Sequence, residues 1–145
     1  MAKPAPPHAI VLGDARVTIN AIVARVFEAL TNAHSLGTWW GKDVLVDAQI
    51  GGVYEATLSI GRVEGTIIAI DGPGTLTVAW PIPQEGGSVV TSVAYTLTPR
   101  GSQTAVHLVH HAPRGVPGDW NRLWRSVLEA LKEHVEGSWT EPTSE

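Results

Sequence analysis

Hydrophobic and polar positions along this chain follow two periods, one typical of helices and one typical of strands. Near the start, residues 16–20 alternate between apolar and polar side chains and predict a first strand. Apolar residues spaced for one helix face follow over 23–30, and a second short helix or turn is expected over 33–40. The helical spacing returns over 119–136, where Asp119 supplies an N-cap carboxylate.

A run of strands is predicted between these helical segments, because the apolar period shortens to two and turns rich in Gly and Pro interrupt it. The predicted strands cover residues 53–58, 62–70, 76–80, 89–97 and 104–110. Pro81 and Pro83 are expected to end the third of them, since proline cannot donate to a strand ladder. Their inward sets are too apolar to face water, so the last helix is expected to cover one face of the sheet.

The expected fold is therefore of the α+β class. A curved antiparallel sheet of about six strands would wrap around the long C-terminal helix, with two short helices after the first strand. The length of 145 residues fits a single domain, placed at 10–138, between two tails at 1–9 and 139–145.

Composition and charge exclude several classes of protein. The net charge of −4 and the scattered Lys and Arg residues argue against a nucleic-acid partner. The absence of cysteine excludes disulfides and thiolate chemistry. We find neither a signal peptide nor an apolar run of the roughly 18 residues that a membrane helix needs. The expectation is a soluble cytoplasmic protein without a membrane partner.

Four motifs resemble those of one known family. They are Val26-Phe-Glu-Ala-Leu-Thr31 with Leu36 and Trp39-Trp40, Asp47 with Gly51-Gly52, Thr104-x-Val106-x-Leu108-x-His110, and Asp119-Trp120 at the start of the last helix. Gln49 stands where that family usually has Arg. Over about residues 16–136 the chain resembles the START-like, helix-grip superfamily (the SRPBCC proteins). Within it, the chain is most similar to the family named after the C-terminal domain of the heat-shock-protein-90 ATPase activator.

The resemblance implies a cavity between the sheet and the C-terminal helix. Three functions follow as expectations: binding of a small apolar or amphipathic ligand, a cyclase or hydratase type of enzyme using the same cavity, or a co-chaperone that stimulates a heat-shock-protein-90 ATPase. A homodimer is a further expectation. Binding ranks first, because no pair of acid and base residues has a recognisable spacing and the chain has no room for the activator's separate N-terminal domain.

Eight residues are the candidates for lining such a cavity. They are Trp39, Trp40, Tyr54, Trp80, Tyr95, His110, Trp120 and Trp124. The tryptophans either pack in the core or form flat apolar walls of a pocket, and Trp40 and Trp124 are the best pocket candidates. His110 should face the concave side of the sheet, either as a hydrogen-bonded core histidine or as the polar anchor of a ligand.

Catalytic and metal-binding groups are not predicted. His107 and His111 should face away from His110, and two histidines without a third ligand make a poor metal site. Glu64 would be a functional candidate only if it faced inward, and a solvated strand position is favoured. The chain lacks the glycine-rich phosphate loops and the nucleophile elbow. We therefore expect no cofactor, no metal and no assigned catalytic residue.

Overall fold

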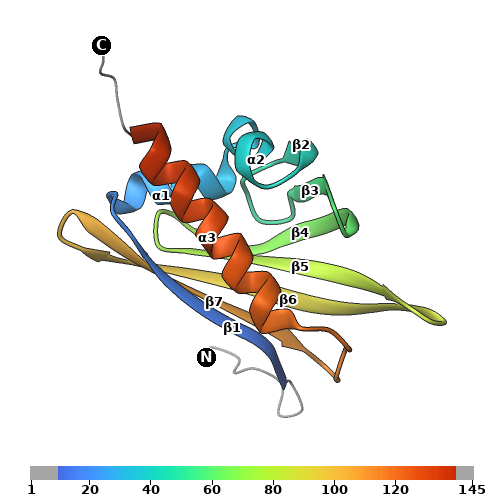
Figure 1. The fold of residues 1–145 in the computed structure, drawn as a ribbon. Helices are drawn as coiled ribbons and strands as arrows, with labels where there is room; N and C mark the ends of the chain where they lie inside the picture. Colours follow the sequence, from blue (N-terminus) through green and yellow to red (C-terminus); the bar gives the residue numbers. More distant parts are fainter. Residues whose placement is uncertain (1–9, 140–145) are drawn as a thin grey trace.

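Seven strands form one antiparallel sheet that curves around a long C-terminal helix in this computed structural model, which describes residues 10–139 (Figure 1). The elements are β1 (Ile10–Ile19), α1 (Val23–Thr31), α2 (Ala33–Trp39), β2 (Lys42–Val46), β3 (Val53–Leu58), β4 (Gly61–Asp71), β5 (Thr75–Gln84), β6 (Gly87–Arg100), β7 (Gln103–Ala112) and α3 (Trp120–Trp139). The helix-grip arrangement expected from the sequence is confirmed.

Strands β2 to β7 form a meander, and β1 pairs with its last strand, β7. The strand order is β1-β7-β6-β5-β4-β3-β2, so β1 and β2 form the two edges. The short helices α1 and α2 connect these edges across one end of the sheet (Figure 1). One strand more is present than the expected six or so, because the short edge strand β2 was not predicted. Its residues are mixed in polarity, and Asp43 has a positive φ of 51° that interrupts the alternation.

The core lies between the concave face of the sheet and α3. The predicted inward sets are buried there, including Tyr54, Val78 and Tyr95. Helix α3 contributes Trp124, Leu128, Leu131 and Val135 from one face, as its amphipathic pattern predicts. Asp119 accepts a hydrogen bond from the Arg122 amide at 3.2 Å and so acts as the predicted N-cap.

The first strand begins at Ile10, six residues before its predicted start, and two further predicted element ends were wrong for physical reasons. Strand β5 continues through Pro81 and Pro83 to Gln84, and these prolines pair with β6. Strand β4 does not pair with β5 beyond Ala79, so the missing proline N–H groups cost no hydrogen bond on that open side. Helix α3 passes Gly137, whose surroundings are open, and runs to Trp139. Trp139, which was expected in the second tail, is thus the last residue of the helix, while the tail expected at 1–9 and residues 140–145 lie outside the described residues.

Gly13 lets α3 approach β1 closely. A Cβ atom at this position would lie 2.7 Å from Cδ1 of Trp124 and 3.1 Å from Cβ of Trp120. The register of β1 against β7 shifts between Val11 and Gly13, so the strand bends at this contact. The next residue, Asp14, donates its amide to Oδ1 of Asn121 on α3 at 2.8 Å. The first strand and the last helix are therefore locked together at the helix N-terminus.

Helix α3 is also tied to β1 at its other end. Lys132 Nζ donates to the Thr18 carbonyl at 3.0 Å, and the backbone N–H of Asn20, just after β1, donates to the Glu136 carboxylate at 2.8 Å.

Within the described residues, no helix combines the length and apolar character needed to cross a membrane.

We expect Gly13→Ala to lower the free energy of unfolding by about 1–3 kcal/mol, because the added methyl group overpacks the contact with Trp124. Gly37→Ala in α2 is the matched control, since nothing lies within 4 Å of its Cβ position. That variant should be neutral or gain up to about 1 kcal/mol from helix propensity. Chemical denaturation of both variants checks this, and equal stabilities would contradict the close approach.

Candidate functional site

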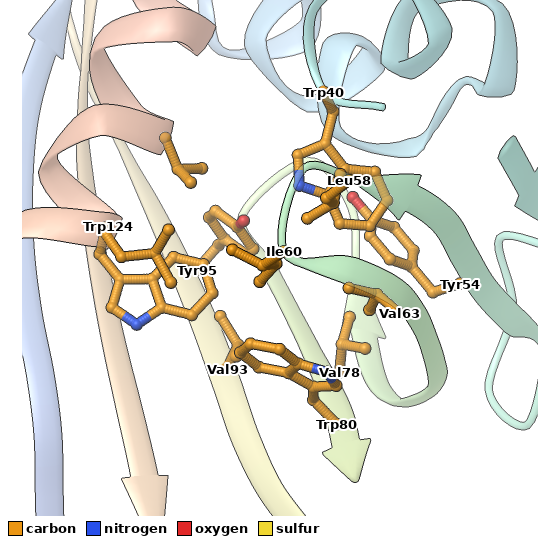
Figure 2. Close-up of a pocket in the computed structure, with 12 residues that line it drawn as sticks. Trp40, Tyr54, Leu58, Ile60, Val63, Val78, Trp80, Val93, Tyr95 and Trp124 are labelled. Atoms are coloured by element: carbon orange, nitrogen blue, oxygen red, sulfur yellow. The ribbon is translucent and has the colours of Figure 1, made fainter. Parts of the chain in front are cut away.

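A narrow apolar hollow lies between α3 and the concave face of the sheet (Figure 2). Its volume is about 40 Å³, room for roughly one to three water molecules or the terminal atoms of a larger molecule. It is lined by Trp40, Tyr54, Leu58, Ile60, Val63, Val78, Trp80, Val93, Tyr95, Leu123, Trp124 and Val127. The strands β3 to β6 provide its floor, the end of α2 one wall and α3 the roof.

A wider groove of about 480 Å³, the outer groove, adjoins this hollow. Its walls are the β3–β4 turn, the far end of β5 and the segment that leads into α3. It shares Ile60, Val63, Trp80 and Leu123 with the hollow. The groove and the hollow are therefore neighbours, and Ile60, a turn residue that is 59% exposed, lines both.

The structure brings together most of the residues predicted for the site. Trp40, Tyr54, Trp80, Tyr95 and Trp124 all line the hollow. Trp120 lines the outer groove beside Trp80.

Trp39 and His110 line neither space. The Trp39 indole donates to the Ala29 carbonyl at 3.0 Å and joins α2 to α1. His110 is buried behind Trp80 and Trp124 and packs against both rings.

Sequence reasoning missed Ile60 and Val63 as lining residues. Ile60 is a large exposed apolar side chain in a tight turn, a position where polar residues are usual, and this was the available signal. Val63 lies on the inward face of β4, in a segment whose two faces are both partly apolar. Alternation alone therefore could not assign it to the cavity side.

A chain of hydrogen bonds through His110 fixes the position of α3 on the sheet. Trp124 Nε1 donates to His110 Nδ1 at 3.0 Å. The Thr91 hydroxyl donates to the Trp80 carbonyl at 2.9 Å, so it accepts from His110 Nε2, which lies 2.8 Å away. Only the neutral imidazole with its proton on Nε2 satisfies all three bonds.

Aromatic rings enclose the imidazole on several sides. Trp80 stacks on it with 5.5 Å between ring centroids, and Trp120 and Trp124 meet it edge-on at 5.0 and 5.2 Å. This burial lowers the pKa of His110 to about 4, with a smaller contribution from His111. The candidate polar anchor is thus a neutral structural histidine at neutral pH, with both ring nitrogens engaged.

The chain contains two tyrosines, and both line the hollow with different hydrogen bonding. Tyr54 donates its hydroxyl to the Leu30 carbonyl and so ties β3 to α1. Tyr95 is only 5% exposed, yet its hydroxyl has no hydrogen-bond partner within residues 10–139. Burial raises the pKa of both groups, and for Tyr54 the neighbouring Tyr95 adds to the increase. Both phenols are therefore protonated at neutral pH.

Charged residues lie outside the hollow. Glu55 pairs with Arg62 at 3.3 Å at the outer surface of β3 and β4, and Glu64 is exposed. His107 and Asp14 pair at 2.9 Å on the face opposite to His110. In the part of the chain that the structure describes, no three side chains of His, Cys, Asp or Glu gather as metal ligands would. Tyr54 and Tyr95 are the titratable groups among the lining side chains.

A curved sheet that grips a C-terminal helix over an apolar hollow defines the START-like, helix-grip class of protein. Within this class, the sequence profile of the family described as "Activator of Hsp90 ATPase homolog 1-like protein" matches residues 20–136. The chain belongs to this family. No curated protein matches the sequence.

Solved structures share the fold at low sequence identity. The solution structure of the Aha1 dimer from Colwellia psychrerythraea has a TM-score of 0.71 and 20% identity, covering 86% of this chain and 95% of that one. Protein MLL2253 from Mesorhizobium loti has a TM-score of 0.69 and 19% identity, with coverages of 86% and 98%. CalU16 from Micromonospora echinospora has a TM-score of 0.69 and 21% identity, with coverages of 90% and 75%.

The His110 arrangement predicts loss of stability in acid. The pKa is 6.5 in the unfolded chain and about 4 in the folded one, so the unfolded state binds the additional proton between these values. The contribution, roughly 3 kcal/mol, is complete above pH 6.5 and is lost as the pH falls toward 4. Nitrogen NMR should show a neutral, Nε2-protonated ring throughout most of this range. Titration near 6.5, or a proton on Nδ1, would contradict the hydrogen-bond chain.

The two tyrosines should respond differently to removal of the hydroxyl group. Tyr54→Phe leaves the Leu30 carbonyl without its donor, and we expect a loss of about 1–2 kcal/mol in unfolding free energy. Tyr95→Phe removes a buried group that has no partner, so the loss should be under about 0.5 kcal/mol, or stability should rise. Thermal or urea unfolding of the pair tests this. A large loss for Tyr95→Phe would show that its hydroxyl is satisfied in the free protein.

Proposed function

We propose that the protein binds a small apolar or amphipathic molecule between the sheet and α3, with the outer groove as its entrance. The observation that carries the proposal is the aromatic hollow that continues into a groove through shared walls. The hollow alone is smaller than small-molecule sites, which measure about 300–1,000 Å³, whereas the groove falls within that range. A ligand would therefore occupy both, with one end inside.

The walls favour binding over catalysis. Tyr54 and Tyr95 have raised pKa values, so neither supplies a base at neutral pH. His110 is separated from the hollow by Trp80 and Trp124, and both of its nitrogens are engaged. A cyclase or hydratase mechanism that needs a base would find none among these residues at neutral pH, although the protonated phenols can donate a hydrogen bond.

Partner proteins are a separate proposal. The family takes its description from an activator of the Hsp90 ATPase, and the Colwellia psychrerythraea relative is described as a dimer. The exposed apolar residues Leu45, Ile50 and Val53 near the β2 edge would support a protein contact there. Stimulation of a bacterial heat-shock-protein-90 ATPase would test the chaperone as a partner. The mass of the protein in solution would test whether a second copy of the chain is a partner.

Two valines on strand β6 test the binding proposal. Val93 lines the hollow, whereas Val90 lies on the opposite face and is 59% exposed. N-phenylnaphthylamine is a neutral apolar dye, and its fluorescence should increase when it binds the wild-type protein in a titration. Val93→Phe should fill the hollow and abolish most of this increase. Val90→Phe should leave the wild-type response, because the same added ring points to solvent.

Native mass spectrometry of protein from its own host would complement the dye titration and give the mass of any bound molecule. Thermal unfolding of Val93→Phe must show a folded protein, since overpacking costs about 1–3 kcal/mol. An equal dye response from the wild type and both folded variants would contradict binding in the hollow.

A further inference from the structure

The hollow contains a buried hydroxyl group that the protein itself does not satisfy. Tyr95 projects from β6 under α3, and Figure 2 shows its oxygen directed into the space between the lining side chains. A buried polar group without a partner costs about 1–3 kcal/mol, so such groups are rare in native proteins and call for an explanation. Tyr54, on the same hollow, shows the usual arrangement, because it donates to a backbone carbonyl.

Two of the tryptophans that line the hollow also have unused donors. The indole N–H groups of Trp40 and Trp80 have no hydrogen-bond partner within residues 10–139. An indole N–H can only donate, and a neutral tyrosine hydroxyl can donate as well as accept. The Tyr95 hydroxyl is therefore a donor without a partner beside the hollow, and the group that complements it is an acceptor.

The surroundings also restrict the charge of that acceptor. None of the residues that line the hollow is charged, and the two charged residues of the outer groove, Arg62 and Asp119, lie at its rim. An anionic group brought into the hollow would lose its hydration without gaining a cation, which is costly. A neutral oxygen, such as a carbonyl, would gain a hydrogen bond without that penalty.

The dimensions restrict the shape of the ligand. A hollow of about 40 Å³ admits only a few atoms, whereas the adjoining groove of about 480 Å³ accepts a ring system. The groove is lined by flat or rigid side chains, among them Trp80, Trp120 and Pro117. Such walls favour a flat, apolar body whose narrow end enters the hollow.

We propose that Tyr95 is the buried anchor of the site and that its ligand is a neutral, flat, mostly apolar molecule with a carbonyl or similar acceptor oxygen at its leading end. This inference rests on the proposed binding function and specifies the chemistry that the site recognises. The apolar body of the ligand lies in the groove, and the Tyr95 hydroxyl donates to the acceptor oxygen.

A matched pair of probes separates the anchor from the apolar walls. Methyl naphthyl ketone and isopropylnaphthalene have nearly the same size and shape, but only the ketone accepts a hydrogen bond. Calorimetry should show that the wild type binds the ketone about fivefold more tightly, which is the usual value of one net hydrogen bond. In Tyr95→Phe the ketone should lose this advantage and bind no more tightly than the hydrocarbon, because its buried oxygen would then have no donor.

Tyr54→Phe is the control on the same hollow. Its hydroxyl already donates to Leu30, so the ratio between the two probes should stay at the wild-type value even if both affinities change. The infrared carbonyl band of the bound ketone gives a second readout, since a hydrogen bond from Tyr95 lowers its frequency in the wild type and in Tyr54→Phe but not in Tyr95→Phe.

The outcomes distinguish this inference from the function on which it rests. If the wild type binds both probes equally, or if Tyr95→Phe keeps the preference for the ketone, the anchor is refuted while binding in the hollow stands. If the wild type binds neither probe, the binding function and the anchor both fail. Loss of the ketone preference in Tyr95→Phe alone would establish Tyr95 as the group that selects the ligand.

Discussion

The position of the last helix depends on one buried histidine with a single allowed protonation state. His110 accepts a hydrogen bond from the Trp124 indole of α3 at one ring nitrogen and donates one to the Thr91 hydroxyl of β6 at the other. The Thr91 hydroxyl in turn donates to the Trp80 carbonyl of β5. Four elements, β5, β6, β7 and α3, are thus joined through directional bonds in a buried setting, where each bond would be costly to leave unmade. Apolar contacts alone would hold α3 on the sheet, but they would not fix its rotation.

This fixed contact lies at one end of the hollow and explains why a hollow exists at all. Close to the N-terminus of α3, Gly13 allows the helix to touch β1, and the tryptophan rings fill the space around His110. On the other side of Trp124 the hollow begins, and its floor includes small side chains such as Val78 and Val93. The same indole therefore has two roles: its N–H fixes the helix, and its ring forms a wall of the hollow.

Local pattern was sufficient to predict most of the fold, since the alternating strands and the amphipathic last helix reflect burial directly. The misjudged ends have a tertiary cause. Pro81 and Pro83 remain in β5 because β4 leaves that side open, and β2 is a short edge strand whose pairing compensates for its mixed sequence.

The site was harder to predict. Alternation could place Tyr54 and Tyr95 on the inward face, but their different hydrogen bonding depends on the Leu30 carbonyl, which lies far away in sequence. The role of His110 likewise required knowing which rings surround it.

The separation between a fixed contact and an adjacent hollow has an evolutionary consequence. The residues that hold α3 on the sheet and most residues that face the hollow belong to different sets, with Trp80 and Trp124 as the main members of both. Substitutions at Val63, Val78 or Val93 would reshape the hollow while leaving the helix contact unchanged. A lineage with this architecture can therefore change the shape of its hollow without losing its fold. Such independence of scaffold and hollow fits the finding that solved structures with about 20% identity to this chain share its fold.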